Sequence, residues 1–185
     1  MPTAQLVDIN PNIASSCNPT GGISYSWLVE AKYISAITIA SGILTNFTMT
    51  STGNWKKYTY DRDATANYNQ TPNRNGKRRT YTQVAFMKFG VIDSTTTIAA
   101  NDAILTCDVV AIHVLVSGTR QVQGLEEDAA TTGGFQLTKV QQTLLMAGQN
   151  TDVSTAEART EFTLQGEANT LSLTTSLSDT AILAL

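Results

Sequence analysis

Val109-Val110-Ala111-Ile112-His113-Val114-Leu115-Val116 is the most apolar run of the chain. Asp108 precedes it and Ser117-Gly118 follows it, so the run is bounded by polar and turn-forming residues. A continuous apolar run of this length, rich in β-branched residues, is typical of a strand that is buried on both faces. It is too short for a membrane-spanning helix, which needs about 20 residues. We therefore predict a fully buried strand here.

Other segments alternate apolar and polar residues, as strands with one buried face do. The expected strands are residues 23–29, 34–39, 44–49, 55–60, 80–89, 160–166 and 170–175. Residues 135–145 fit either a strand or a helix. One short helix is expected over residues 94–105, where apolar residues approach helical spacing and Ser94 can serve as N-cap. The pattern predicts a mainly β fold, an antiparallel β-sandwich or half-barrel with one short flanking helix and extended arms.

The composition also favours strands. Threonine, which is β-branched, fills 29 of the 185 positions, and only 15% of the residues are charged. The usual charged fraction is about 25%, so the surface of this protein is poor in charge. A subunit covered by its neighbours tolerates such a surface better than a monomer does. We therefore expect self-association.

The chain divides into an arm and one domain. Residues 1–22 hold three of the four prolines and predict an extended N-terminal arm, and residues 23–185 predict a single β-rich domain. Residues 61–79 are the most polar stretch and include Asn75-Gly76, a strong hairpin signal. We expect a long, protruding hairpin loop at 61–79.

Charge and cysteine content exclude several classes of protein. The formal net charge of -3 gives no general attraction to nucleic acid or to an anionic membrane. Residues 1–5 have neither the basic nor the apolar region of a secretory leader, and no apolar run approaches 18 residues. We expect cytoplasmic synthesis, no membrane partner and reduced thiols at Cys17 and Cys107.

Residue types needed for catalysis are scarce. His113 is the only histidine, and its place in the apolar run predicts a buried residue with satisfied ring nitrogens rather than a catalytic base. Motifs for phosphate loops, dinucleotide binding, nucleophile elbows and thiol pairs are absent from the sequence. Asp61 with Asp63, and Glu126-Glu127-Asp128, lack the ligand spacing of a calcium loop and predict exposed acidic turns. We expect no enzyme, no metal and no cofactor.

One dense cationic cluster stands out, formed by Arg74, Lys77, Arg78 and Arg79. With Tyr68 and Tyr81 nearby, it could bind nucleic acid by phosphate pairing and stacking. Alternatively, it could form salt bridges with acidic residues of a neighbouring subunit, namely Asp61, Asp63, Glu126, Glu127 or Asp128. We favour the second interpretation, because four charges on a loop of an acidic protein make a poor nucleic-acid groove but a directional subunit interface.

The order of features resembles that of bacteriophage virion proteins, and within them the tail-tube-like subunits of long-tailed phages. The elements that carry the resemblance are Cys17 before Gly21-Gly22-Ile23, Ile34-Ser35-Ala36-Ile37, Gly42-Ile43-Leu44-Thr45, Tyr58-Thr59-Tyr60, Val109-Val110-Ala111-Ile112, Gln123-Gly124-Leu125-Glu126, Thr132-Gly133-Gly134 and the strand at 160–167. They span most of the chain, and each is short.

The resemblance implies a β-sandwich or half-barrel that forms rings, usually hexameric, which stack into a tube. DNA would then pass through the tube as cargo, other tail proteins would be partners, and the location would be the virion after assembly in the host cytoplasm. The long arm and the 61–79 segment depart from the simplest pattern of such proteins. Both would suit contacts between rings.

Two other classes of protein fit the same sequence. A capsid decoration or head-to-tail connector protein would share the composition and the lack of catalytic residues. A carbohydrate- or receptor-binding β-sandwich could use Trp27, Trp55 and tyrosines as a stacking platform. Because both tryptophans lie in alternating strands, core packing is the favoured role for them.

Overall fold

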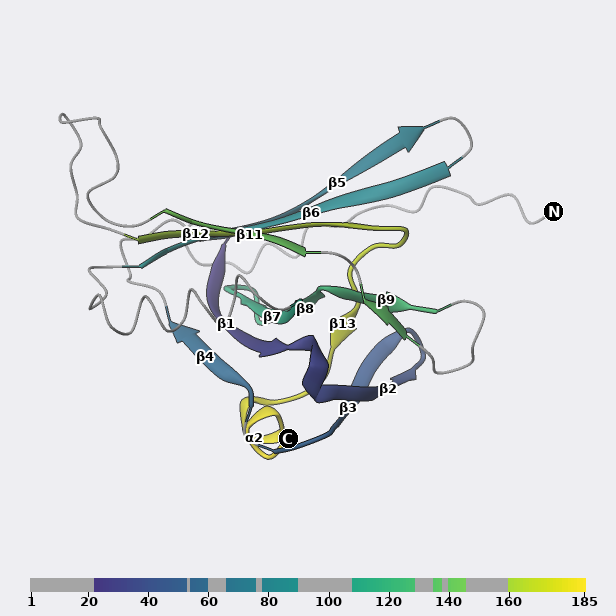
Figure 1. Cartoon of the computed structure of the whole chain (residues 1–185), viewed down its shortest axis with the longest axis vertical. Helices are drawn as coiled ribbons and strands as arrows, with labels where there is room; N and C mark the ends of the chain where they lie inside the picture. The colour runs from purple at the N-terminus through teal and green to yellow at the C-terminus, as the bar shows by residue number, and fades with distance from the viewer. Residues whose placement is uncertain are drawn as a thin grey trace, which may run out of the picture.

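Two β-sheets lie face to face, with one short helix beneath the larger sheet (Figure 1). The computed structural model describes residues 22–52, 54–59, 66–75, 78–89, 108–128, 135–137, 140–145 and 160–185. Within these residues the protein is mainly β, so the predicted fold class is confirmed.

The larger sheet has seven strands in the order β2-β3-β13-β8-β7-β1-β4. Neighbouring strands are antiparallel except β13 and β3, which are parallel. The strands are β1 (Ile23–Glu30), β2 (Ile34–Ala40), β3 (Ile43–Met49), β4 (Lys56–Thr59), β7 (Val109–Leu115), β8 (Arg120–Gln123) and β13 (Thr174–Thr175). A 3-10 turn, η1 (Ala31–Tyr33), joins β1 to β2.

The smaller sheet is antiparallel, with the strand order β11-β12-β6-β5. Its strands are β5 (Asn67–Asn75), β6 (Arg78–Phe89), β11 (Val140–Leu145) and β12 (Thr160–Ala168). A separate two-stranded ladder pairs β9 (Leu125–Glu127) with β10 (Phe135–Leu137).

Strand β7 lies near the middle of the larger sheet and is buried on both faces, as its apolar sequence predicted. On one face Val110 and Ile112 join a core cluster with Trp27 and Phe47. On the other face alternate residues of β7 pack against the smaller sheet; this second cluster includes Val109, Ala111, Ala85, Met87, Phe162 and Leu164. The period-two alternation of side chains thus lets one strand serve two cores.

The segment after β12 crosses from the smaller sheet to the larger one and completes it. Its strand β13 inserts between β3 and β8, and the helix α2 (Asp179–Leu183) follows. Ser178 caps this helix, its Oγ accepting a hydrogen bond from the Ala181 N–H at 3.2 Å. Ile182 is fully buried and anchors the helix in the first core.

Gly124 marks the point where the chain leaves the larger sheet between β8 and β9. Its φ of +98° lies in the region that favours glycine. A Cβ atom at this position would lie 2.4 Å from the backbone oxygen of Val109, so only glycine allows the two backbones to approach this closely.

Most predicted strands are present within a residue or two of their expected bounds, and residues 135–145 contain two short strands rather than a helix. Two predictions were wrong. Residues 170–173 are not in a strand, because the chain is crossing between sheets there. Residues 67–75 are not loop but strand β5, which its pairing with β6 holds in an extended form despite many asparagines. The expected helix at 94–105, residues 1–21 of the arm, Cys17 and Cys107 lie outside the described residues.

Candidate assembly surface and buried polar centres

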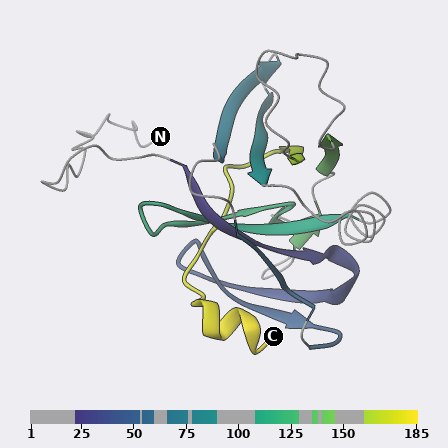
Figure 2. The ribbon, with the colours of Figure 1, turned by 90° about the vertical axis from the view of Figure 1, so that its left-hand side faces the viewer.

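The β5–β6 hairpin extends past the rest of the smaller sheet. Strand β12 pairs with β6 only as far as Ala168 opposite Tyr81, whereas β5 stays paired with β6 up to Asn75 opposite Arg78. The end of the hairpin is therefore a two-stranded ribbon, and it stands apart from the larger sheet in both views (Figures 1 and 2). A projecting hairpin is thus present, but over residues 67–75 and 78–89 it consists of paired strands rather than the predicted loop, and residues 61–65 and 76–77 lie outside the described residues.

The ribbon carries two arginines directly opposite one another. The strand register pairs Arg74 with Arg79, and both residues are exposed. Like charges at directly opposed positions of an antiparallel pair generally disfavour the pairing. Because both exposed guanidinium groups lie on one face of the ribbon, a single anionic group could contact both of them, which suits an acidic partner.

The alternation of side chains places these arginines on a definite face. Arg79 shares its side of β6 with Gln83, Ala85 and Met87, all of which are buried against the larger sheet. The ribbon thus extends the inward face of the smaller sheet beyond the core, with arginine in place of apolar residues. A partner would reach both arginines from that side.

The free edge of the ribbon discourages pairing with another strand. Strand β5 is an edge strand, and Pro72 lies at its middle, opposite Tyr81. Proline has no N–H to donate, and sheets tolerate it where that position faces the free edge. Contacts at this hairpin should therefore run through side chains rather than through an added strand.

The acidic residues expected to meet this cluster are placed differently from the prediction. Glu126 is only 4% exposed, and its carboxylate accepts hydrogen bonds from the Asn169 N–H at 2.6 Å, the Asn169 Nδ2 at 2.9 Å and the Thr170 N–H at 3.3 Å. The expected exposed turn is thus wrong for Glu126, because three donors compensate its burial. Asp128 is half-buried.

Several predicted site residues cannot be placed. Lys77, Asp61, Asp63 and the side chains of Arg78 and Glu127 lie outside the described residues. Among the described carboxylates, those of Asp108 and Glu167 belong to exposed residues. Either can present an acidic group to another molecule.

A buried polar centre lies between the sheets around His113. The Ser26 Oγ lies 2.7 Å from His113 Nδ1, and the Gln123 Oε1 lies 2.9 Å from His113 Nε2. The Gln123 Nε2 donates to the carbonyl oxygens of Gln83 on β6, at 3.1 Å, and Leu164 on β12, at 3.2 Å. Gln123 therefore joins the larger sheet to two strands of the smaller one.

The donors and acceptors of this centre fix the tautomer of the imidazole. Because the Gln123 Nε2 donates to carbonyls, its Oε1 faces His113 and must accept from the Nε2–H of the ring. His113 Nδ1 then accepts from the Ser26 hydroxyl. The prediction of a buried histidine with satisfied nitrogens is confirmed.

Serine beside histidine also occurs in nucleophilic catalysis, but these residues do not face solvent. Ser26 and His113 are 0% exposed, and Gln123 is 1% exposed. Burial lowers the pKa of His113 to about 4, an effect that the hydrogen bond with Gln123 opposes in part. The ring is therefore neutral at pH 7, and the centre stabilises the packing of the two sheets.

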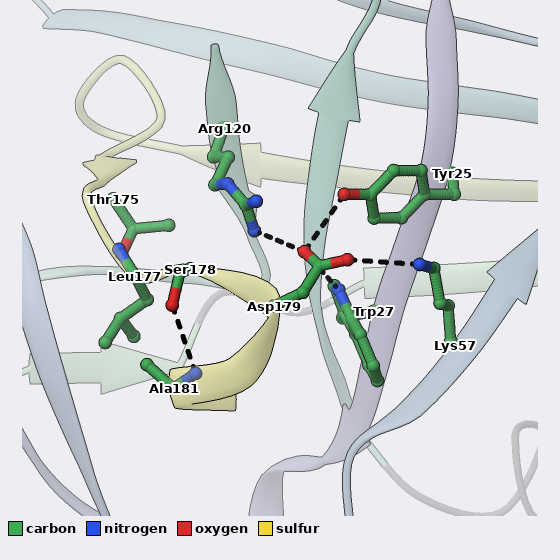
Figure 3. Close-up of polar contacts among 9 residues, drawn as sticks. All are labelled: Tyr25, Trp27, Lys57, Arg120, Thr175, Leu177, Ser178, Asp179 and Ala181. Carbon is green, nitrogen blue, oxygen red and sulfur yellow. Dashed lines mark hydrogen bonds and ion pairs between the residues drawn. The ribbon is translucent and has the colours of Figure 1, made fainter. Parts of the chain in front are cut away.

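A second polar centre surrounds Asp179 at the start of α2 (Figure 3). The Asp179 Oδ1 accepts hydrogen bonds from the Tyr25 hydroxyl at 2.9 Å, Trp27 Nε1 at 3.3 Å and the Arg120 guanidinium at 2.8 Å, and Oδ2 pairs with Lys57 Nζ at 3.0 Å. Burial alone would raise the pKa of Asp179, but these four donors outweigh it and lower the pKa to about 2. One carboxylate thus fastens α2 to β1, β4 and β8.

Replacing Asp179 by alanine should cost about 2 kcal/mol of unfolding free energy, because two ion pairs and two hydrogen bonds are lost at a partly exposed site. The wild-type contribution should be constant above pH 3.8 and fall as the pH drops through about 2, since the folded-state pKa is the lower one. Urea unfolding measures both. Asp108→Ala is the control, and an equal loss in both variants would contradict a fastening role.

The tryptophans proposed as a stacking platform are in the core. Trp27 is 2% exposed and Trp55 is 3% exposed, and the Trp55 ring packs edge-on against Phe47 with centroids 5.1 Å apart. The expected core role is confirmed for both. Neither ring is available to stack on a sugar.

A shallow groove of about 270 Å³ lies beside β1, η1 and β4. Its polar lining is already engaged within the chain, since Asn54 donates to Ser51 and Glu30 pairs with Lys32. Tyr33 and Tyr58 add aromatic surface. The groove lacks the converging set of polar groups that fixes a small ligand.

Three comparisons bear on the identity of the chain. No family model, no curated protein and no solved structure matches it. Within the described part of the chain, no cluster of three or more metal-ligating side chains occurs. In that same part, no helix has the length and apolar character needed to cross a membrane.

Proposed function

We propose that this protein is a structural subunit of a phage virion, a tail-tube protein whose rings stack around a channel for DNA. The observation that carries the proposal is the projecting hairpin, whose exposed Arg74 and Arg79 oppose each other in the register. In a ring, the hairpin would give each copy a cationic projection that contacts an acidic surface of the next copy.

Other features of the molecule support the proposal. The fold is mainly β, and its polar centres at His113 and Asp179 join strands and sheets. The net charge of -3 suits a channel wall that DNA passes without sticking. Exposed Asp108 and Glu167 offer acidic groups to a neighbouring copy. The proposed partners are further copies, in rings of six, and other tail proteins.

A capsid decoration or connector protein remains the second candidate, since the same hairpin could dock on a different virion protein. Electron microscopy of the purified protein separates the two functions. Stacked rings or tubes from the protein alone favour the tail tube. Single rings or monomers that bind only to another virion protein favour the connector or decoration role.

Reversing both charges, as Arg74→Glu with Arg79→Glu, should abolish assembly while leaving the unfolding midpoint of the subunit nearly unchanged. Acidic side chains would then face the acidic surface of the neighbour, and each small loss is repeated at every interface of the polymer. Light scattering and negative-stain microscopy at micromolar concentration measure assembly. Added salt should weaken wild-type assembly, because it shortens the Debye length, which is roughly 8 Å at physiological ionic strength and roughly 3 Å at 1 M salt.

Two further variants sharpen this test. Arg74→Glu alone places a carboxylate opposite Arg79, so it should stabilise the hairpin yet still reduce assembly. Thr71→Glu adds a negative charge to the same strand on the other side and serves as the control. Normal tubes from the double variant would contradict the interface role, and a strictly monomeric wild type would contradict self-assembly. If the wild type retarded DNA and the double variant did not, while both still assembled, the result would favour nucleic-acid binding by the arginines instead.

A further inference from the structure

The polar centre between the sheets contains the one imidazole of the chain, and none of the described groups that contact this imidazole carries a negative charge. Ser26 of β1 and Gln123 of β8 hydrogen-bond the ring of His113, and the ring of Tyr68 from β5 lies 4.9 Å from it, centroid to centroid. Behind Gln123 lie backbone carbonyls of β6 and β12. Of these groups only Tyr68 is titratable, and burial raises its pKa, so it stays neutral in acid.

Protonation of His113 would disrupt this centre in two ways. In the neutral ring Nδ1 accepts from the Ser26 hydroxyl, 2.7 Å away, whereas in the charged ring both nitrogens are donors. The Ser26 hydrogen bond must then reverse or break. A cation would also be buried at 0% exposure among neutral groups, which is strongly unfavourable.

The hydrogen bonds of the centre determine which part of the structure responds when His113 is protonated. Gln123 accepts from His113 and, through the same amide group, donates to Gln83 and Leu164 on the opposite sheet. A rearrangement at His113 therefore acts directly on the hydrogen bonds that cross between the sheets. One buried polar atom close by, the Gln83 Nε2, makes no hydrogen bond within the described residues, so the interface between the sheets already contains an unsatisfied donor.

We propose that neutral His113 holds the two sheets together and that its protonation in acid releases the four-stranded sheet from the seven-stranded one. The four-stranded sheet is formed by β5, β6, β11 and β12. The inference does not depend on the proposed virion role. It assigns the protein a conformational response to mildly acidic conditions.

The direction and size of the response follow from the pKa of His113, which is 6.5 for the free group and about 4 in the folded protein. The unfolded or opened state binds the proton more tightly, so stability is full above pH 6.5 and falls as the pH drops toward 4. The equilibrium constant for opening should rise about 300-fold over this interval, since each pH unit contributes a factor of about ten.

The test compares the wild type with His113→Gln between pH 7 and pH 4, using urea unfolding and hydrogen exchange corrected for the intrinsic rate. In the wild type, amides of β6 and β12 should lose protection before those of β2 and β3. His113→Gln keeps an amide donor for Gln123 but cannot titrate, so its stability should be nearly flat over the same range apart from the carboxylates shared by both proteins. Parallel pH profiles for the two proteins would overturn the proposal.

A second measurement keeps the test decisive if the variant does not fold. Because the chain has a single histidine, the imidazole resonances in an NMR titration of the wild type belong to His113. We expect the Nε2–H tautomer of His113 at pH 7. The ring should become protonated only as the amides between the sheets lose their protection. If His113 titrated near pH 6.5 while the sheets stayed packed, the proposal would be refuted.

Discussion

Replacing Gly124 by alanine should cost about 2–6 kcal/mol, enough to unfold a marginally stable domain. A φ of +98° strains any residue with a Cβ by about 1–3 kcal/mol. The new methyl group would also lie 2.4 Å from the Val109 carbonyl oxygen, a backbone atom that cannot rotate away, and overpacking of this kind costs about 1–3 kcal/mol. Guanidinium unfolding measures the loss.

Gly118→Ala is the matched control for this substitution. Gly118 also has a positive φ, of +85°, but nothing lies within 4 Å of a Cβ placed there. This variant should show the conformational strain without the collision. Equal losses in the two variants would mean that the close approach of Gly124 to β7 does not matter.

Replacing Gln123 by methionine should cost about 3–5 kcal/mol, although the side chain keeps its approximate size. The substitution removes both hydrogen bonds to the smaller sheet and leaves the His113 Nε2–H without its acceptor. Each buried group left unsatisfied costs about 1–3 kcal/mol. Urea unfolding measures this loss, and hydrogen exchange should show the largest effect on β6 and β12.

Gln165→Met provides the comparison, because Gln165 lies on β12 but is exposed. Its replacement should change stability by no more than about 0.5 kcal/mol, as is usual for surface positions. If Gln123→Met were equally mild, the hydrogen bonds between the sheets would contribute nothing and the role assigned to His113 would lose its basis.

The features that depend on a local sequence pattern could be predicted from the sequence. The alternating strands, the buried run around His113 and the dense charge at Arg74 and Arg79 are all visible within a few residues. Strand β5 was missed because asparagine and proline disfavour strands, and only its partner β6 makes it extended. Local propensity was overridden by pairing.

The hydrogen bonds of Asp179 and Glu126 were not predicted, because their partners are remote in sequence. Asp179 meets Tyr25 and Trp27 across more than 150 positions, and Glu126 meets Asn169 across 43. A run of three acidic residues indicates an exposed turn unless a distant donor set is known. The one local signal available was Ser178-Asp179 before an apolar segment, which is typical of a helix start.

The position of β13 has a consequence for synthesis of the protein on the ribosome. This strand follows all others in the chain, yet it occupies the third place in the seven-stranded sheet. Until it emerges, the β2–β3 hairpin has no strand joining it to β8, and both flanking strands present unpaired edges. Such edges invite pairing between nascent chains, and closure by so distant a segment is slow. A growing chain thus keeps these strand edges open until β13 has taken its place, so the larger sheet closes only after synthesis has passed residue 175.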